Sequence, residues 1–234
     1  MHYKTGEDSP SPMIGPLSNL ILTGSQPRTN LSSMKTIHLA VLALGLVGVG
    51  WLLAGCVPAG VQPFYGGADV VYEPALLGLW KDKPGGKEGW NFTAGEGKSY
   101  SLEIQSDDQR AGFEAHLFKL GAERFLDLYP AKPALESSLE KNPYGVALIP
   151  GHLFVRVRAT SPALRMSCMS LDWLKEQLKQ APKALDHVVT GDRVVFTGST
   201  DSMQTFIKQH LDDAAAWNEM YGTGLVRVAN SGQK

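Results

Sequence analysis

The sequence is short of cysteine and has no excess of either charge. Only two cysteines occur in its 234 residues, Cys56 and Cys168, and the first ends an apolar run, so no disulfide framework is expected. Lys and Arg number 22 against 23 Asp and Glu, which gives a net charge of -1. Without a basic excess to neutralise phosphates, no nucleic-acid partner is expected.

The signatures of common catalytic sites are also missing from the sequence. The chain has no GxSxG, no P-loop, no dinucleotide-binding glycine motif and no histidine pair at metal-ligand spacing. Cys168 is interpreted as a buried, inert thiol rather than a nucleophile. We therefore expect no catalytic residue, no cofactor and no metal.

What the chain does contain is one long apolar run over residues 36–55, preceded by Met34 and Lys35. A short basic start followed by such a run is typical of a secretory signal. The run ends Leu53-Ala54-Gly55-Cys56, which resembles the lipobox of bacterial lipoproteins. The resemblance implies cleavage before Cys56, and attachment of lipid, including acyl chains such as palmitate, to that cysteine. Membrane lipid is then the partner that holds the mature protein.

The lipobox resemblance divides the N-terminal part of the chain. Residues 34–55 are interpreted as a signal peptide, with an uncleaved transmembrane helix as the alternative. Residues 1–33 are polar and rich in Pro, Ser and Gly, and we interpret them as an extension from a start codon assigned upstream of Met34. A genuine cytoplasmic extension is the alternative. In bacteria with two membranes, an aspartate directly after the lipidated cysteine retains a lipoprotein at the inner membrane. This chain has Val57 at that position, so the resemblance implies a location at the outer membrane, facing the periplasm.

The residues after the cysteine are predicted to be a flexible tether. Residues 56–71 are rich in Pro and Gly, a composition typical of mobile linkers. A single β-rich domain is expected over 72–230, and 231–234 are expected to be a disordered tail.

From Ala75 onward, short runs of alternating apolar and polar residues predict antiparallel strands. Such clean alternation indicates a sheet with one face in water. Strands are expected around 77–81, 90–92, 99–104, 113–120, 124–129, 153–157, 164–169, 194–197 and 225–228.

One predicted hairpin brings together four side chains that could bind a polar ligand. A two-residue turn at Gly121 sets His116 opposite Asp127, with Glu114 facing Tyr129 on the same side. A carboxylate beside an imidazole prepares a general base or a metal ligand. The alternative is ordinary cross-strand charge pairing on a face that points to solvent, because the other face of the hairpin is apolar.

His152 is a further candidate outside that hairpin. It follows Pro150 and Gly151 at the start of an expected strand, a place where loops supply functional side chains. A surface histidine is the alternative.

Two helices are expected in the C-terminal half. The first, over 171–180, has apolar residues at helical spacing and Ser170 as its N-cap, and the second, over about 201–215, has Thr200 as its N-cap. The predicted fold class is mainly β: an antiparallel β-barrel or half-barrel with two accessory helices.

The first expected strand begins Gly78-Leu79-Trp80, which resembles the GxW signature of lipocalins. The resemblance implies a lipocalin-like barrel of eight strands, with Trp80 at its closed end beneath Arg227 from the last strand, in a cation–π contact. The chain departs from the family in lacking a Thr-Asp-aromatic motif and in placing a helix near Trp173 between two strands. The alternative is a core tryptophan in another β-sandwich. The domain is also similar to uncharacterised bacterial lipid-anchored proteins with strand-rich domains, which implies no activity.

Two functions are compatible with these patterns. The lipocalin resemblance implies a membrane-tethered module that binds a small apolar or amphipathic ligand in its barrel. The alternative is a structural or protein-interaction module of the cell envelope with a solid core, to which an envelope protein docks at the exposed loop Ala131 to Gly145.

Overall fold

The protein is described by a computed structural model that covers residues 57–229. The predicted extension, signal peptide, Cys56 and C-terminal tail lie outside the described residues. Within the described part, no helix is long and apolar enough to cross a membrane.

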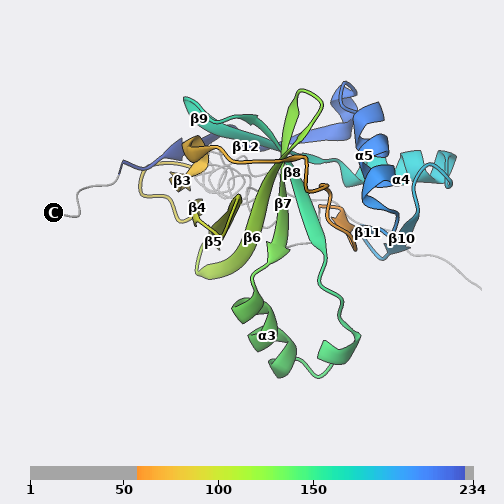
Figure 1. Cartoon of the computed structure of the whole chain (residues 1–234), viewed down its shortest axis with the longest axis horizontal. Coiled ribbons are helices and arrows are strands. Elements are labelled where there is room, and N and C mark those ends of the chain that lie inside the picture. The colour runs from red at the N-terminus through yellow and green to blue at the C-terminus, as the bar shows by residue number, and fades with distance from the viewer. Residues whose placement is uncertain (1–56, 230–234) are drawn as a thin grey trace, which may run out of the picture. The chain divides into compact units, whose positions relative to one another are not determined.

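Eight antiparallel strands close into a barrel in which each strand pairs with its neighbours along the chain (Figure 1). The last strand pairs with both the seventh and the first, and pairing of the sixth with the seventh completes the ring. The predicted class, a mainly β fold with an antiparallel barrel and accessory helices, is therefore confirmed. The strands are β3 (Gly78–Lys81), β4 (Gly89–Ala94), β5 (Ser99–Ser106), β6 (Gln109–Leu120), β7 (Glu123–Pro130), β8 (His152–Ala159), β9 (Ala163–Met169) and β12 (Trp217–Arg227).

Side chains fill the interior of the barrel. Strand alternation turns every second residue inward, so that Leu117 of β6 and its opposite residue Leu126 of β7 both have no exposed surface. Aromatic rings from β3, β4 and β5 occupy the remaining space. The large inner residues are Trp80, Trp90, Phe92, Tyr100, Leu102 and Ile104, none more than 4 % exposed.

A second apolar core lies on the outer face of the same barrel wall. Phe118, Phe125 and Phe154 point outward from β6, β7 and β8, yet each is fully buried. They are covered by helices α4 (Leu171–Gln180) and α5 (Thr200–Gln209) and by the hairpin of β10 (His187–Thr190) and β11 (Arg193–Phe196), on the right in Figure 1. The expectation of one face in water is therefore wrong for this part of the wall.

The two predicted helices are present, with a correction to the second. Helix α4 has the predicted bounds, and Ser170 caps it by accepting from the backbone N–H of Trp173 at 3.4 Å. Helix α5 ends at Gln209, and its N-cap is Ser199 rather than Thr200. The Thr200 hydroxyl donates instead to the carbonyl of Pro63 at 2.8 Å, so a long-range contact replaces the predicted local one.

A third helix stands where a loop was expected. Helix α3 (Lys132–Lys141) and the 3-10 turn η2 (Gly145–Ala147) connect β7 to β8 and project below the barrel in Figure 1. A proline in the first turn suits a helix start, because that position has no backbone N–H partner to lose. The last strand also differs from the prediction of 225–228. Strand β12 begins at Trp217, and its register with β9 shifts between Met220 and Leu225.

Residues 57–71, which we call the strap, are built into the fold. Within it, β1 (Ala59–Gly60) pairs with β8 and β11, and β2 (Val70–Val71) pairs with β6. Val57 is 6 % exposed and Phe64 is fully buried in the outer core. The predicted flexible tether is therefore wrong for residues 57–71, which belong to the folded domain. A short 3-10 turn, η1 (Pro74–Leu76), follows the strap.

Candidate functional site

The hairpin of β6 and β7 holds the four side chains that the sequence singles out. Its register sets His116 opposite Asp127 and Glu114 opposite Tyr129, as predicted. Gly121 has the positive φ, 66°, that the first residue of such a tight turn needs. The four side chains belong to the outer face, because their strand neighbours fill the barrel.

That outer face is covered by the strap. The backbone N–H of Phe64 donates to Oδ2 of Asp127 at 2.9 Å, and the carboxylate is only 1 % exposed. The alternative that this patch points to solvent is therefore wrong at its centre. A buried carboxylate must have its oxygens paired, and the strap supplies one of the two partners.

His152 supplies the other partner. Its Nδ1 lies 2.7 Å from Oδ1 of Asp127, and its side chain is 13 % exposed. The ring of Tyr129 packs against the imidazole with centroids 4.6 Å apart. A carboxylate facing Nδ1 favours a proton on that nitrogen.

His116 lies at the edge of the same group. The ring of Tyr65, from the strap, packs on it with centroids 4.8 Å apart, and Nε2 of His116 is 3.7 Å from Oε1 of the half-exposed Glu114. Burial, followed by the negative charges of Asp127 and Glu114, raises the pKa of Tyr65. Tyr65 therefore keeps its phenolic proton at neutral pH.

We call Tyr65, His116, Asp127, Tyr129 and His152 the Asp127 cluster. An Asp–His pair acts as a general base when the second nitrogen of the imidazole contacts a nucleophile or a substrate. The partners that the structure describes for His152 are the carboxylate of Asp127 and the ring of Tyr129. Over residues 57–229, no group of three or more His, Cys, Asp or Glu side chains is placed to hold a metal. The geometry supports a fastening of the strap to the barrel.

A second fastening holds the strap from the helix side. The Gln204 amide of α5 donates to the carbonyl of Phe64 at 3.0 Å and to Oδ2 of Asp69 at 2.8 Å. The Gln204 bond, followed by the backbone N–H of Gly66, which donates to the same oxygen at 2.8 Å, lowers the pKa of Asp69. The strap is thus bonded both to the barrel beneath it and to the helix beside it.

The predicted contact at the head of the barrel is present. The guanidinium of Arg227 lies 4.5 Å from the ring centroid of Trp80, and the two residues are opposite each other in the β12–β3 pairing. Arg227 also donates to the carbonyl of Ala75, and the Trp80 indole donates to the carbonyl of Leu76 at 2.8 Å. Gly78 begins the strand with a φ of 116°, which favours glycine. This group links β3 and β12 where the first and last strands of the barrel pair.

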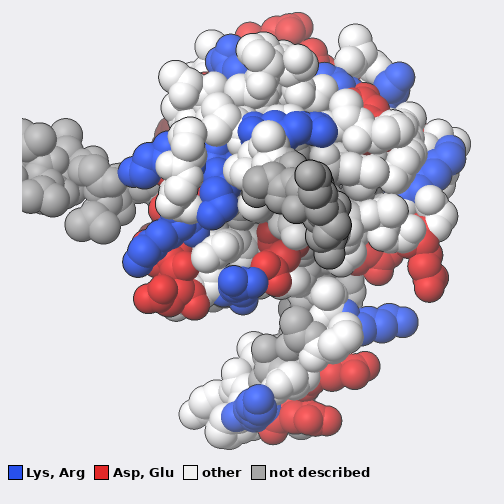
Figure 2. Space-filling view, turned by 90° about the vertical axis from the view of Figure 1, so that its left-hand side faces the viewer, with Lys and Arg blue, Asp and Glu red and all other residues white. Residues whose placement is uncertain are grey.

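A groove of about 700 Å3 opens beside the first described residue, at the end of the barrel where Phe113 of β6 and Leu153 of β8 reach from the inner core. The strap contributes Val57, Ala59 and Val61 to it, and the other walls come from β6, from the ends of β7 and β8, from the chain before β8 and from β10 and β11. Figure 2 shows acidic and basic side chains interspersed on another face of the protein, with α3 projecting below.

Sequence reasoning missed the strap residues Phe64 and Tyr65. Their signal is an aromatic pair inside a segment otherwise rich in glycine and proline. His152 was singled out separately from the hairpin, and the structure joins it to Asp127.

Comparison with known proteins gives no match among family models, curated proteins or solved structures. The function is therefore argued from the residues themselves.

Proposed function

We propose that this protein is a lipid-anchored component of the bacterial cell envelope, held to a membrane by acyl chains on Cys56. Its barrel is a solid scaffold that presents surfaces to partners. In a host with two membranes, Val57 after the cysteine favours the outer membrane, facing the periplasm.

The observation that carries the proposal is the sequence Leu53-Ala54-Gly55-Cys56 at the end of an apolar run, directly before a folded domain. The small residues Ala54 and Gly55 allow a peptidase to approach the backbone. Two or three acyl chains bury enough methylene groups for stable anchoring, whereas a single chain binds reversibly. The domain that follows needs no further membrane segment.

The packing of the barrel favours a scaffold over a carrier of small ligands. A lipocalin-like carrier keeps space in the barrel for its ligand. Here Trp90, Tyr100 and Phe92 occupy the interior and are at most 1 % exposed, and a ligand would have to displace them. The projecting α3–η2 segment is the exposed surface most accessible to an envelope protein, in the loop Ala131 to Gly145.

Metabolic labelling with an alkyne fatty acid tests the anchor. The wild-type protein is expected to take up the label, to begin at Cys56 by mass spectrometry and to fractionate with membranes. Cys56→Ser should lose the label and remain unprocessed, while the matched control Cys168→Ser should keep it. A Cys56→Ser variant that is processed and partitions like wild type would disprove the lipid anchor.

Native mass spectrometry of the mature protein in detergent separates a scaffold from a carrier. The scaffold is expected to show the mass of the acylated polypeptide alone. A reproducible extra mass in the range of a small apolar molecule, lost on denaturation, would instead support the carrier with a ligand in its barrel.

A further inference from the structure

Exposed apolar side chains gather near the start of the domain. Among the residues that the structure describes, six large hydrophobic side chains are exposed, and only Val226 belongs to the barrel wall. Three of the others flank the turn η2 and two lie on the edge strand β10. They are Tyr144 (75 %), Leu148 (49 %), Ile149 (80 %), Val188 (52 %) and Val189 (51 %).

Four of these residues form what we call the apolar rim: Tyr144, Leu148, Ile149 and Val188. Ile149 and Val188 line the same groove of about 700 Å3 although they come from different parts of the chain. Leu148 ends η2 and precedes Ile149 in the chain, and Tyr144 is at the other end of that turn. Val189 is left out because strand alternation turns it to the opposite side of β10 from Val188.

The same groove contains the first described residue of the chain. Val57 lines it and is 6 % exposed, held there by the pairing of β1 with β8 and β11. Cys56 is bonded to Val57, and consecutive Cα atoms are about 3.8 Å apart. A lipid on Cys56 therefore leaves the protein beside the apolar rim, with no mobile linker between lipid and fold.

We propose that the apolar rim is a membrane-docking surface, which inserts into the interface of the bilayer that holds the Cys56 lipid. This inference rests on the proposed lipid anchor and adds to it an orientation: the groove end of the domain faces the membrane.

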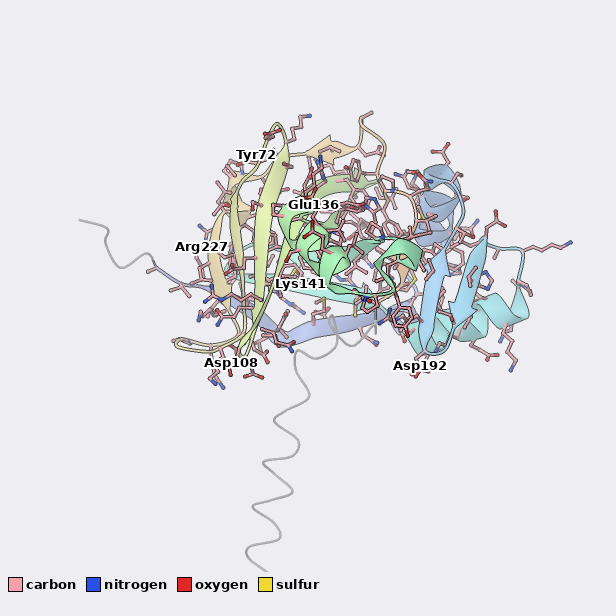
Figure 3. All side chains as sticks on the ribbon, turned by 90° about the horizontal axis from the view of Figure 1, so that it is seen from below. Tyr72, Asp108, Glu136, Lys141, Asp192 and Arg227 are labelled. Atoms are coloured by element: carbon pink, nitrogen blue, oxygen red, sulfur yellow. The ribbon has the colours of Figure 1, made fainter. Side chains whose placement is uncertain are left out.

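The chemistry of the rim fits a bilayer interface. Contiguous exposed aliphatic side chains are uncommon on soluble surfaces unless something covers them. Tyrosine is enriched at membrane interfaces, where its ring is buried and its hydroxyl is hydrated. Figure 3 views the protein from below and labels Lys141, at the end of α3, and Asp192, between β10 and β11. Charged residues near the rim can stay in the headgroup layer while the aliphatic groups insert.

The test places a tryptophan on the rim and measures its contact with lipid. Ile149→Trp and, as a matched control, Val226→Trp are purified from membranes as full-length processed proteins. Val226 is also an exposed aliphatic residue, but it lies on β12 next to Arg227, on the opposite side of Figure 3 from Asp192. Each protein is reconstituted into vesicles of phosphatidylethanolamine and phosphatidylglycerol, with and without lipids brominated on the acyl chain near the glycerol.

We expect bromine to quench most of the emission that Ile149→Trp adds to the wild-type signal, and to leave the emission added by Val226→Trp unchanged. The wild-type protein provides the background emission of its own tryptophans. Circular dichroism of both variants verifies that they are folded. If Ile149→Trp misfolds, Val188→Trp probes the other side of the groove and serves the same purpose.

The mass of the same samples separates the two proposals. Acylated Cys56 with an unquenched tryptophan at the rim overturns the docking surface and leaves the anchor intact. Absence of acyl mass on Cys56 overturns the anchor, and with it the docking surface that depends on it. A rim covered by a second copy of the chain would also give no quenching and would count against the membrane.

Discussion

The Nδ1 atom of His152 lies 2.7 Å from Oδ1 of Asp127, while the other oxygen of that carboxylate accepts the backbone N–H of Phe64. One buried carboxylate thus joins three parts of the chain: β7, the first residue of β8 and the strap. The pairing of a carboxylate with an imidazole resembles that of a catalytic pair. Here, however, the carboxylate bonds to the backbone of the strap and to the first residue of β8, and both bonds hold the fold together. A group of this kind contributes to stability and makes the attachment of the strap specific.

Asp127→Ala is expected to lower the free energy of unfolding by about 3 kcal/mol, because it leaves the buried N–H of Phe64 and the partly buried imidazole of His152 without their acceptor. Urea unfolding followed by tryptophan fluorescence measures the loss. Asp108→Ala, at the exposed turn between β5 and β6, is the control and should change stability by less than about 0.5 kcal/mol. A loss in Asp127→Ala no larger than in the control would contradict the fastening role.

Arg227→Ala is expected to lower the free energy of unfolding by about 1 kcal/mol, through loss of the cation–π contact with Trp80 and of the bond to Ala75. Thermal denaturation measures the change. Arg110, whose Nη1 is 3.0 Å from Oε1 of Glu103 on an exposed strand pair, provides the comparison. Arg110→Ala should cost about 0.5 kcal/mol or less, as exposed ion pairs do. Equal losses in the two variants would remove the special role of the Trp80 contact.

The barrel strands could be predicted because the pattern that specifies them lies in residues close together in the sequence. Alternation along β5, where Tyr100, Leu102 and Ile104 face inward, depends only on neighbouring residues. The register of His116 and Asp127 follows in the same way from a turn of two residues. The helices α4 and α5 were recognisable from their apolar spacing.

The cover of the candidate site could not be predicted, because it depends on contacts between distant residues. Phe64 and Asp127 are 63 residues apart, and Phe64 and Gln204 are 140 apart. The strap has the composition of a linker, and its order comes from tertiary bonds that no local pattern encodes. Helix α3 was missed for a different reason: its proline was interpreted as a loop signal, although proline is well tolerated in the first turn of a helix.

Tyr221 is expected to make stability depend on alkaline pH. Burial is the main cause that raises the pKa of Tyr221 from 10.0 to about 12, although the indole N–H of Trp90 donates to its hydroxyl at 2.8 Å. The folded protein therefore keeps a proton that the unfolded chain releases. This contribution is fully present below pH 10 and is lost as the pH rises toward 12.

Tyr221→Phe should therefore lose less unfolding free energy between pH 10 and pH 12 than the wild type. Burial also raises the pKa values of Tyr65 and Tyr100, so some alkaline loss should persist in the variant. Urea titrations at a series of pH values measure both slopes. Parallel pH dependence in the two proteins would show that Tyr221 is not the group responsible.

Phe64→Ala distinguishes most directly between a tether and a strap. A residue in a mobile linker contributes almost nothing to the free energy of unfolding. Phe64, in contrast, is fully buried, and its ring lies 4.5 Å from that of Phe154 and 6.1 Å from that of Phe196. Removing a buried phenylalanine side chain costs about 4 kcal/mol, from lost burial and from the cavity left behind.

The neighbouring Gln62 is exposed and provides the matched control, since Gln62→Ala changes the same segment without touching the outer core. Its effect should stay within about 0.5 kcal/mol. Urea unfolding of both variants measures the difference. If Phe64→Ala were as stable as Gln62→Ala, the strap would be loosely held. The lipid on Cys56 would then be free to move relative to the barrel, and the orientation proposed for the apolar rim would lose its structural basis.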